Sequence, residues 1–333
     1  MAAFTGGIAV PSARFRVRQY VPGLQSQGVI VDEMHSPFGQ YPPKKIWQRP
    51  FWGLAALAGM VPLVARSYSY DVVLLQREML STFFTLESLT KSPRVLDVDD
   101  AIFLYRGGGF ARRLAKVSDR VICGNEYLAN WFGDWNSNVT IIPTAIDTSR
   151  YLPAGGGMQS AKRIGWIGTA GNLQYLRAID VPLAQAMAIV PDSRLLVVCD
   201  EAPVFEAVPS DRVDFIKWSE DGEIDAIQSM DVGIMPLADS AWARGKCSFK
   251  MLQYMSCQVP VVASPVGMNA EVFSLGNFGI PARSAAQWVD GLVEILRNDT
   301  MAKDMGINGR QVVEQHFSLQ VLAQRLASAL RFT

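Results

Sequence analysis

Residues 231–271 read DVGIMPLADSAWARGKCSFKMLQYMSCQVPVVASPVGMNAE, and the order of their patterns decides the fold class. An apolar run ends at Pro236, a loop follows, and a stretch with helical spacing leads to a second apolar run. A strand, a helix and a strand in this order predict a βαβ unit with parallel strands. We expect the helix to begin near Cys247 or Ser248 and to end near Cys257.

The same rhythm continues along the rest of the chain, where short β-branched runs alternate with longer helical patterns. Several runs are apolar throughout, as expected for strands that are covered on both faces. We therefore predict an α/β protein with two Rossmann-like, doubly wound domains that face a cleft. The expected strands are Gly28–Asp32, Asp71–Leu75, Val95–Asp99, Arg120–Cys123, Val139–Ile142, Arg163–Ile167, Arg194–Cys199, Val213–Lys217, Val232–Pro236 and Val259–Ala263.

The length of 333 residues accommodates two domains, since single cores stop growing near ~250–300 residues. The most linker-like segment is Leu152–Ser160 (LPAGGGMQS). We predict an N-terminal domain at 1–155, a C-terminal domain at 160–315 and a terminal helix at 316–333. Ligands of doubly wound sheets bind beyond the carboxyl ends of the strands, so the residues after each strand are the ones to inspect.

Composition argues against some classes of function. Lysine and arginine together number 31, as do aspartate and glutamate, so the overall basic field that a nucleic-acid binder needs is absent. With two histidines and four scattered cysteines, we expect buried thiols in a reducing compartment and no metal site. Met1–Gly7 does not open a secretory signal, and we expect a cytoplasmic protein. The cysteines are Cys123, Cys199, Cys247 and Cys257.

The most apolar stretch is Phe51–Ala65 (FWGLAALAGMVPLVA). It is shorter than the ~20 residues of a membrane span, and we expect a buried helix of a soluble domain. Basic and aromatic residues interleave in residues 44–52. That mixture suits either a surface against anionic headgroups or a solvated loop with aromatics in the core. Peripheral contact with the inner face of the cell membrane through 44–52 therefore stays open.

Cations cluster at the predicted helix start. Lys246 and Lys250 are four residues apart and Gln253 is three further on, which would place all three on one helix face. A helix entrance already favours an anion through its N–H groups and its dipole, and Arg244 adds a third cation. The pattern favours a bound diphosphate, with a ribose hydroxyl at Gln253. A solvated basic helix start is the alternative.

At this block the sequence resembles the group-1 (family 4) GT-B glycosyltransferases of bacterial polysaccharide and cell-envelope assembly. Met255-Ser256-Cys257-Gln258, followed by Pro260–Ser264 (PVVAS), is similar to the small-residue step and strand after the family's donor helix. Further similar segments follow in the family's order: Ser12–Tyr20, Asp71–Glu78, Leu96–Phe103, Cys123–Leu128, Ile142–Asp147 and Arg163–Leu176.

This resemblance implies an enzyme that moves a sugar from a nucleotide-diphosphate sugar to a hydroxyl of a saccharide or lipid-linked saccharide. It implies retention of anomeric configuration and no metal or other cofactor. The acceptor would bind to the N-terminal domain and the donor to the C-terminal one, with the helix 316–333 returning to the N-terminal domain. The donor residues that it implies are Gly168, Thr169, Trp218, Arg244, Lys246, Ser248, Lys250 and Gln253.

Two departures from the family pattern bear on activity. Where relatives commonly have glutamates toward the ribose and the donor sugar, this chain has Gln253 and Gly245. A glutamine can still bond a hydroxyl, whereas a glycine offers no side chain. A non-catalytic nucleotide-sugar-binding subunit and a sugar-nucleotide epimerase are the rival interpretations. For Trp218, a core position competes with a contact to the base.

On the acceptor side, Asp99 and Asp100 follow a predicted strand. Because adjacent carboxylates are costly to bury unless paired, we predict that one of them orients or deprotonates the acceptor hydroxyl. Capping of the next helical segment is the alternative. Arg14 and Arg16 are expected to bind an acceptor phosphate, such as that of a lipid carrier, or to be a surface pair.

Overall fold

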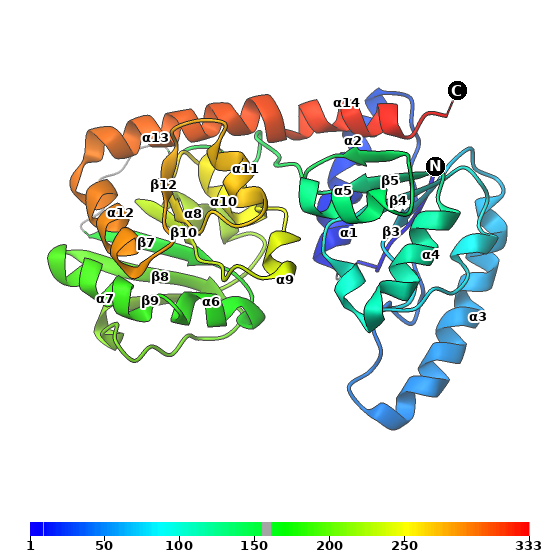
Figure 1. Ribbon diagram of the computed structural model, residues 1–333, viewed down its shortest axis with the longest axis horizontal. Helices are drawn as coiled ribbons and strands as arrows, with labels where there is room; N and C mark the ends of the chain where they lie inside the picture. Colours follow the sequence, from blue (N-terminus) through cyan, green and yellow to red (C-terminus); the bar gives the residue numbers. More distant parts are fainter. Residues whose placement is uncertain (9, 155–160, 333) are drawn as a thin grey trace. The chain divides into compact units, whose positions relative to one another are not determined.

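The computed structural model describes residues 1–8, 10–154 and 161–332, which form two compact units (Figure 1). The first unit comprises Met1–Ala145, Arg244–Cys247 and Leu319–Thr333, and the second comprises Ile146–Ala243 and Ser248–Ser318. Residues 146–154 therefore pack with the second unit, ahead of the predicted boundary at 155. Most of the predicted linker, 155–160, lies outside the described residues.

The first unit is built on six parallel strands in the order β2-β1-β3-β4-β5-β6. The order changes direction between β1 and β3, and this switch point is where such sheets bind ligands. The strands are β1 (Ala2–Phe4), β2 (Asp32–Met34), β3 (Val73–Gln76), β4 (Arg94–Val98), β5 (Arg120–Cys123) and β6 (Val139–Ile141). The helices are α1 (Pro11–Arg16), α2 (Val21–Ser26), α3 (Arg49–Ser67), α4 (Gly109–Val117), α5 (Glu126–Gly133) and α14 (Leu319–Ala329).

The second unit repeats the architecture with the order β12-β11-β10-β7-β8-β9, again all parallel. Its switch point lies between β7 and β10. The strands are β7 (Lys162–Ile167), β8 (Ser193–Cys199), β9 (Val213–Lys217), β10 (Val232–Met235), β11 (Val261–Ala263) and β12 (Gly279–Pro281). The helices are α6 (Leu173–Arg177), α7 (Asp180–Ile189), α8 (Glu223–Gln228), α9 (Ala241–Arg244), α10 (Phe249–Ser256), α11 (Met268–Phe273), α12 (Ala285–Arg297) and α13 (Asp299–Val312).

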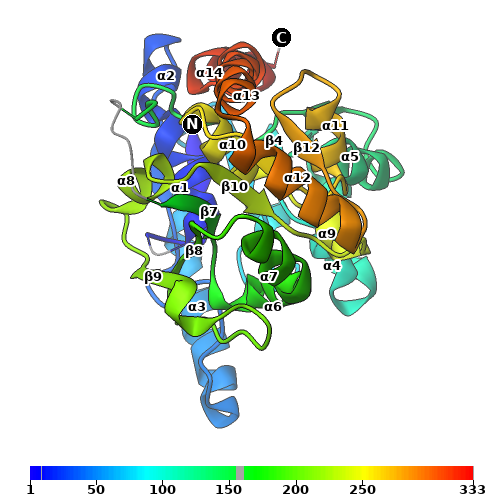
Figure 2. The same ribbon diagram turned by 90° about the vertical axis from the view of Figure 1, so that its left-hand side faces the viewer.

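The C-terminal helix α14 belongs to the first unit. Its Leu322 and Leu326 are buried in one core with Tyr20 and Leu24, and α14 lies beside α2 (Figure 2). A Cβ on Gly23 of α2 would lie 2.7 Å from the Cβ of Ala323, so a glycine is needed for this close helix approach. Apolar burial at helical spacing therefore fixes the tail on the first sheet.

The strand predictions hold along most of the chain but fail at β1 and β2 of the first sheet and at the edge strand β12 of the second. Gly28–Asp32 is wrong: only Asp32–Met34 pairs, and Ile30 is 77 % exposed. Strands β1 and β12 were not predicted. The all-parallel two-sheet fold class is confirmed, and all four cysteines are buried thiols.

The helix α3 corrects another prediction. We expected Phe51–Ala65 to be buried, but the side chains of Phe51 and Leu54 are 72 % and 70 % exposed. In Figures 1 and 2, α3 extends away from the strands of its own unit. Among the described helices, none is long and apolar enough to cross a membrane.

Candidate active site

In the second unit, a lysine meets a glycine at the switch point of the sheet. Lys250, the second residue of α10, places its Nζ 4.9 Å from the centre of the Trp166 ring. A Cβ on Gly168, directly after β7, would lie 2.7 Å from that Nζ and 2.3 Å from the indole. Position 168 therefore requires a glycine, because the side chains of Lys250 and Trp166 occupy the space where a Cβ would lie. The result is a cation at the carboxyl end of β7, where a parallel sheet receives an anionic ligand.

The start of α10 differs from the prediction. The helix begins at Phe249, and Ser248 before it takes a left-handed conformation, with φ of 52°. Lys246 therefore precedes the helix and does not share a helix face with Lys250, so that prediction is wrong. The Ser248 hydroxyl is buried and donates to the side-chain oxygen of Asn269 at 2.6 Å. The side chain of Ser248, the N-cap residue of α10, makes no capping hydrogen bond.

Gln253 and Trp218 take part in one buried hydrogen-bond chain. The Gln253 amide donates to the Tyr151 hydroxyl at 2.9 Å, and Tyr151 donates to Glu223. The indole N–H of Trp218 donates to the other Glu223 oxygen at 2.8 Å. Gln253 is 2 % exposed, whereas Trp218 is 40 % exposed. The Trp218 indole is thus held in place with part of its ring exposed, while the geometry of Gln253 gives its predicted ribose contact no support.

The segment Arg244–Cys247 packs on the first unit. The Asn125 amide donates to the carbonyls of Arg244 and Lys246 at 3.1 and 3.0 Å. A Cβ on Gly245 would lie 2.6 Å from the Cβ of Ala101 and 2.9 Å from its backbone nitrogen. Only glycine allows this approach, so the residue at the predicted sugar position is set by packing.

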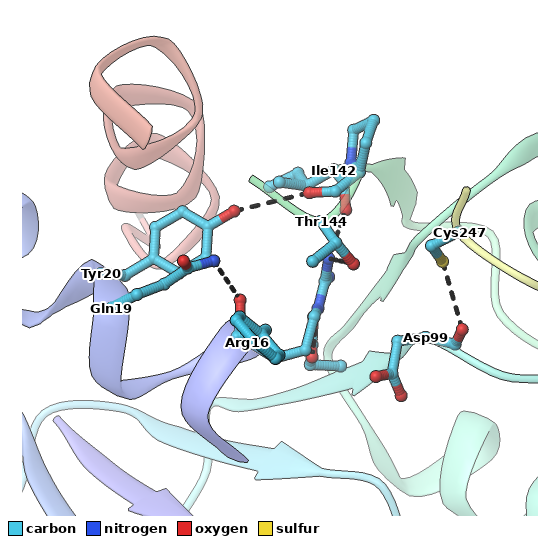
Figure 3. Close-up of polar contacts among 10 residues, drawn as sticks. Arg16, Gln19, Tyr20, Asp99, Ile142, Thr144 and Cys247 are labelled. Carbon is cyan, nitrogen blue, oxygen red and sulfur yellow. Dashed lines mark hydrogen bonds and ion pairs between the residues drawn. The ribbon is translucent and has the colours of Figure 1, made fainter. Parts of the chain in front are cut away.

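The two predicted catalytic carboxylates lie after β4 in the first unit. Asp100 accepts a hydrogen bond from Nη1 of Arg77 at 3.2 Å, and the backbone oxygen of Asp99 accepts from the Cys247 thiol (Figure 3). Burial and then the neighbouring Asp99 raise the pKa of Asp100 to about 6. Burial also lowers the pKa of Lys246, whose charge acts on Asp100. Asp100 can therefore exchange a proton near neutral pH.

The capping alternative for this pair is wrong. The short helix that follows, Ile102–Leu104, has Ala101 at its N-cap position, and no side chain among the described residues caps it.

Arg16 has a structural partner. Its guanidinium donates to both carboxylate oxygens of Asp97, and Nη1 donates to the Ile142 carbonyl at 2.9 Å. Arg16 is 3 % exposed. Removing one partner of such a buried pair typically costs about 3–5 kcal/mol. Arg16 therefore holds α1 to β4, and neither its predicted acceptor contact nor a place in a surface pair fits this burial. Arg14, half-buried, lies 4.7 Å from the ring centre of Phe15.

Comparisons with known proteins agree with this geometry. Residues 162–298 match the family described as glycosyl transferases group 1. Sucrose-phosphate synthase from Thermosynechococcus elongatus has a TM-score of 0.77 at 16 % identity, covering 98 % of this chain and 97 % of its own. Residues 162–298 are a group 1 glycosyltransferase domain. By sequence, no protein of curated function matches the chain.

Two further structures have the same fold as this chain. HepE from Anabaena, in complex with UDP and glucose, has a TM-score of 0.72 at 14 % identity, covering 99 % of this chain and 98 % of its own. WaaG, a glycosyltransferase involved in lipopolysaccharide biosynthesis, has a TM-score of 0.70 at 14 % identity, with full coverage of both chains. The predicted GT-B fold is confirmed, and the comparisons indicate a glycosyltransferase.

The glycosyltransferase domain and its partner unit contain site residues that we did not predict. Glu223 fixes the Trp218 indole, and Asp200 after β8 accepts from the backbone N–H of Ala170 at 2.6 Å. Arg77 and Glu78 follow β3 at the switch point of the first sheet. Their position directly after strands was the signal that could have found Asp200, Arg77 and Glu78. Among the described residues, no cluster of histidine, cysteine, aspartate and glutamate is arranged to hold a metal ion.

Proposed function

We propose that this chain transfers a sugar from a nucleotide-diphosphate sugar to a hydroxyl of a saccharide or lipid-linked saccharide. The observation that carries the proposal is the Lys250 ammonium beside Gly168 at the switch point of the second sheet. A departing diphosphate carries negative charge, and a fixed cation in a partly desolvated position stabilises it. Trp218 offers its half-exposed ring to the base. HepE has been solved in complex with UDP and glucose and with UDP-glucose, and these complexes support this donor class.

The finer features of the proposal are transfer with retention, independence of metal ions and a role in cell-envelope or polysaccharide assembly. The last is supported by the name of WaaG, which places that protein in lipopolysaccharide biosynthesis. We further propose a cytoplasmic location. Arg244, Lys246 and Ser248 stay predicted donor residues, as does Thr169 after β7.

The structure also favours a second candidate function, a nucleotide-sugar-binding subunit without activity. Gly245 leaves no space for the glutamate that relatives commonly have at the sugar position. An enzyme consumes its donor, whereas a binding subunit is stabilised by the donor and leaves it intact.

A ligand panel tests the proposed function. In the presence of EDTA, we expect UDP-glucose or another nucleotide-diphosphate sugar to raise the melting temperature, because it binds only the folded state. The same ligand should be hydrolysed or transferred, as measured by release of the nucleoside diphosphate. No shift with any nucleotide sugar would contradict the proposal. A shift without release would favour the binding subunit, and release that requires Mg²⁺ would contradict metal independence.

We also propose that α3 and the turn before it contact an anionic membrane. Ile46, Trp47, Phe51 and Leu54 are 67–74 % exposed. Residues 34–70 contain Lys44, Lys45, Arg49 and Arg66 and no aspartate or glutamate. Large exposed apolar side chains beside cations are the pattern of a surface that lies in the headgroup region.

Vesicle sedimentation tests this contact. We expect the protein to bind vesicles that contain phosphatidylglycerol and to release as salt rises, because the attraction of the cations is screened. Changing Trp47, Phe51 and Leu54 together to serine should lower binding about tenfold or more, since each buried apolar side chain contributes roughly 1.5–3 kcal/mol. Equal binding to neutral phosphatidylcholine vesicles would contradict the role of the cations, and unchanged binding of the triple variant would contradict the contact through Trp47, Phe51 and Leu54.

A further inference from the structure

The switch point of the first sheet holds polar side chains with buried, unpartnered atoms. Among the described residues, most buried side-chain atoms that lack a hydrogen-bond partner belong to Gln76, Arg77, Glu78 and Asp99. The first three are consecutive at the end of β3, and Asp99 follows the neighbouring β4. Buried polar groups are nearly always satisfied in folded proteins, so such a concentration at one sheet edge calls for a binding role.

Glu78 is the centre of this group. Its side chain is 1 % exposed, and its Oε1 accepts from the backbone N–H of Thr82 at 3.1 Å. Its Oε2 lies 3.8 Å from Nε of Arg77, which is too long for a hydrogen bond. The Arg77 guanidinium instead donates through Nη1 to Asp100. Each side chain is thus fixed by one hydrogen bond, and Nε of Arg77 and Oε2 of Glu78 form an ion pair in which neither atom has a hydrogen-bond partner.

The buried atoms without a hydrogen-bond partner include both donors and acceptors. Nε of Arg77 is a donor, while Oε2 of Glu78 and Oδ1 of Asp99 are acceptors. A sugar hydroxyl both donates and accepts, so neighbouring hydroxyls of one ring could satisfy such a set. The side-chain amide of Gln76, at the same strand end, adds a donor and an acceptor.

The charges select against an anion. Three carboxylates, those of Glu78, Asp99 and Asp100, outnumber the nearby cations Arg77 and Lys246, which act electrostatically on this group. Arg16, one of the two arginines predicted to bind an acceptor phosphate, is bonded to Asp97. A further buried negative charge would add to this excess of carboxylates without a matching cation, which is costly.

We propose that this switch point binds an uncharged, hydroxyl-bearing ring of the acceptor, with Glu78 and Arg77 as its hydrogen-bond partners. The proposal rests on the proposed function and adds the chemical class of the acceptor group. It reverses the expectation of an acceptor phosphate in this unit. Sugar rings that carry a carboxylate or a phosphate are rejected here, and neutral or amino-bearing rings are accepted.

Ligand-observed NMR on the full chain with UDP tests the acceptor class. The probes are the methyl glycosides of glucose, galactose and mannose, methyl glucuronide and glucose 6-phosphate. We expect a neutral glycoside to bind about tenfold or more tightly than the matched glucuronide. Glu78→Gln removes a charge-assisted hydrogen bond, which should weaken neutral binding about tenfold and reduce the discrimination against the glucuronide.

The control is Glu87→Gln in the same unit. Glu87 is fully buried, but its carboxylate accepts from the backbone N–H groups of Met79 and Thr85, so its loss should lower the melting temperature and leave the neutral-to-glucuronide ratio unchanged. The proposal is overturned by tighter binding of the glucuronide or phosphate, by absence of neutral binding, or by an unchanged ratio in Glu78→Gln. If Glu78→Gln does not fold, the wild-type ratio decides. Absence of a nucleotide-sugar shift overturns the proposed function instead.

Discussion

Changing Lys250 to glutamine is expected to lower kcat by about 10²–10³, the loss seen when one group that stabilises transition-state charge is removed. Glutamine keeps most of the length and removes the charge that lies beside Gly168. The negative charge on the diphosphate grows as the bond to the sugar breaks, so the loss should fall on kcat more than on the KM for the donor. Steady-state kinetics with the nucleotide sugar identified by the ligand panel measure both constants.

Two comparisons isolate the charge of Lys250. Lys303→Gln removes an exposed lysine from α13 of the same unit and should leave kcat within twofold. Lys250 also lies over the Trp166 ring, and losing this cation–π contact costs roughly 0.5–2 kcal/mol of stability. The melting temperature therefore has to be measured beside kcat. A Lys250→Gln variant that turns over within threefold of the wild type would remove the diphosphate role.

The central strands of both sheets were predictable because strands that are buried on both faces consist of consecutive apolar, often β-branched residues. Strand β1, Ala2–Phe4, has no β-branched residue and pairs because β2 and β3 flank it. Strand β12, Gly279–Pro281, holds two residues that strands disfavour, and its place at the sheet edge tolerates the proline. Short strands of this kind form because they pair with neighbouring strands, and the local sequence does not reveal that pairing.

The candidate site was predictable in its location and less so in its members. The rule that ligands bind after strands pointed to Gly168 and Asp99, and Lys250 followed from the helix that comes next. The spacing of the lysines placed Lys246 in that helix. The helix instead begins at Phe249, because Ser248 takes a left-handed backbone conformation. Burial decided the rest: sequence spacing cannot show that Arg16 pairs with Asp97 or that one oxygen of Glu78 is enclosed without a partner.

The pH dependence of transfer gives the second large effect. If Asp100 orients and deprotonates the acceptor hydroxyl, it must be ionised in the active enzyme. With its pKa raised to about 6, chiefly by burial and then by Asp99, only about one tenth is ionised at pH 5. We therefore expect kcat/KM for the acceptor to fall roughly tenfold per pH unit below pH 6 and to level off above pH 7.

Variants around Asp100 show which group causes the fall in kcat/KM below pH 6, here called the acidic limb. Asp100→Asn should lower kcat/KM by about 10²–10⁴ and abolish the limb, because the titrating group is gone. Arg77→Gln removes a cation that lowers the pKa of Asp100, so the limb should move to higher pH. Asp134→Asn, on the exposed end of α5, changes neither. If activity still falls at low pH in Asp100→Asn, the proton transfer belongs to another group. Asp99→Asn would then be the variant to measure. Among the described residues, the Oδ1 atom of Asp99 is a buried carboxylate oxygen without a hydrogen-bond partner.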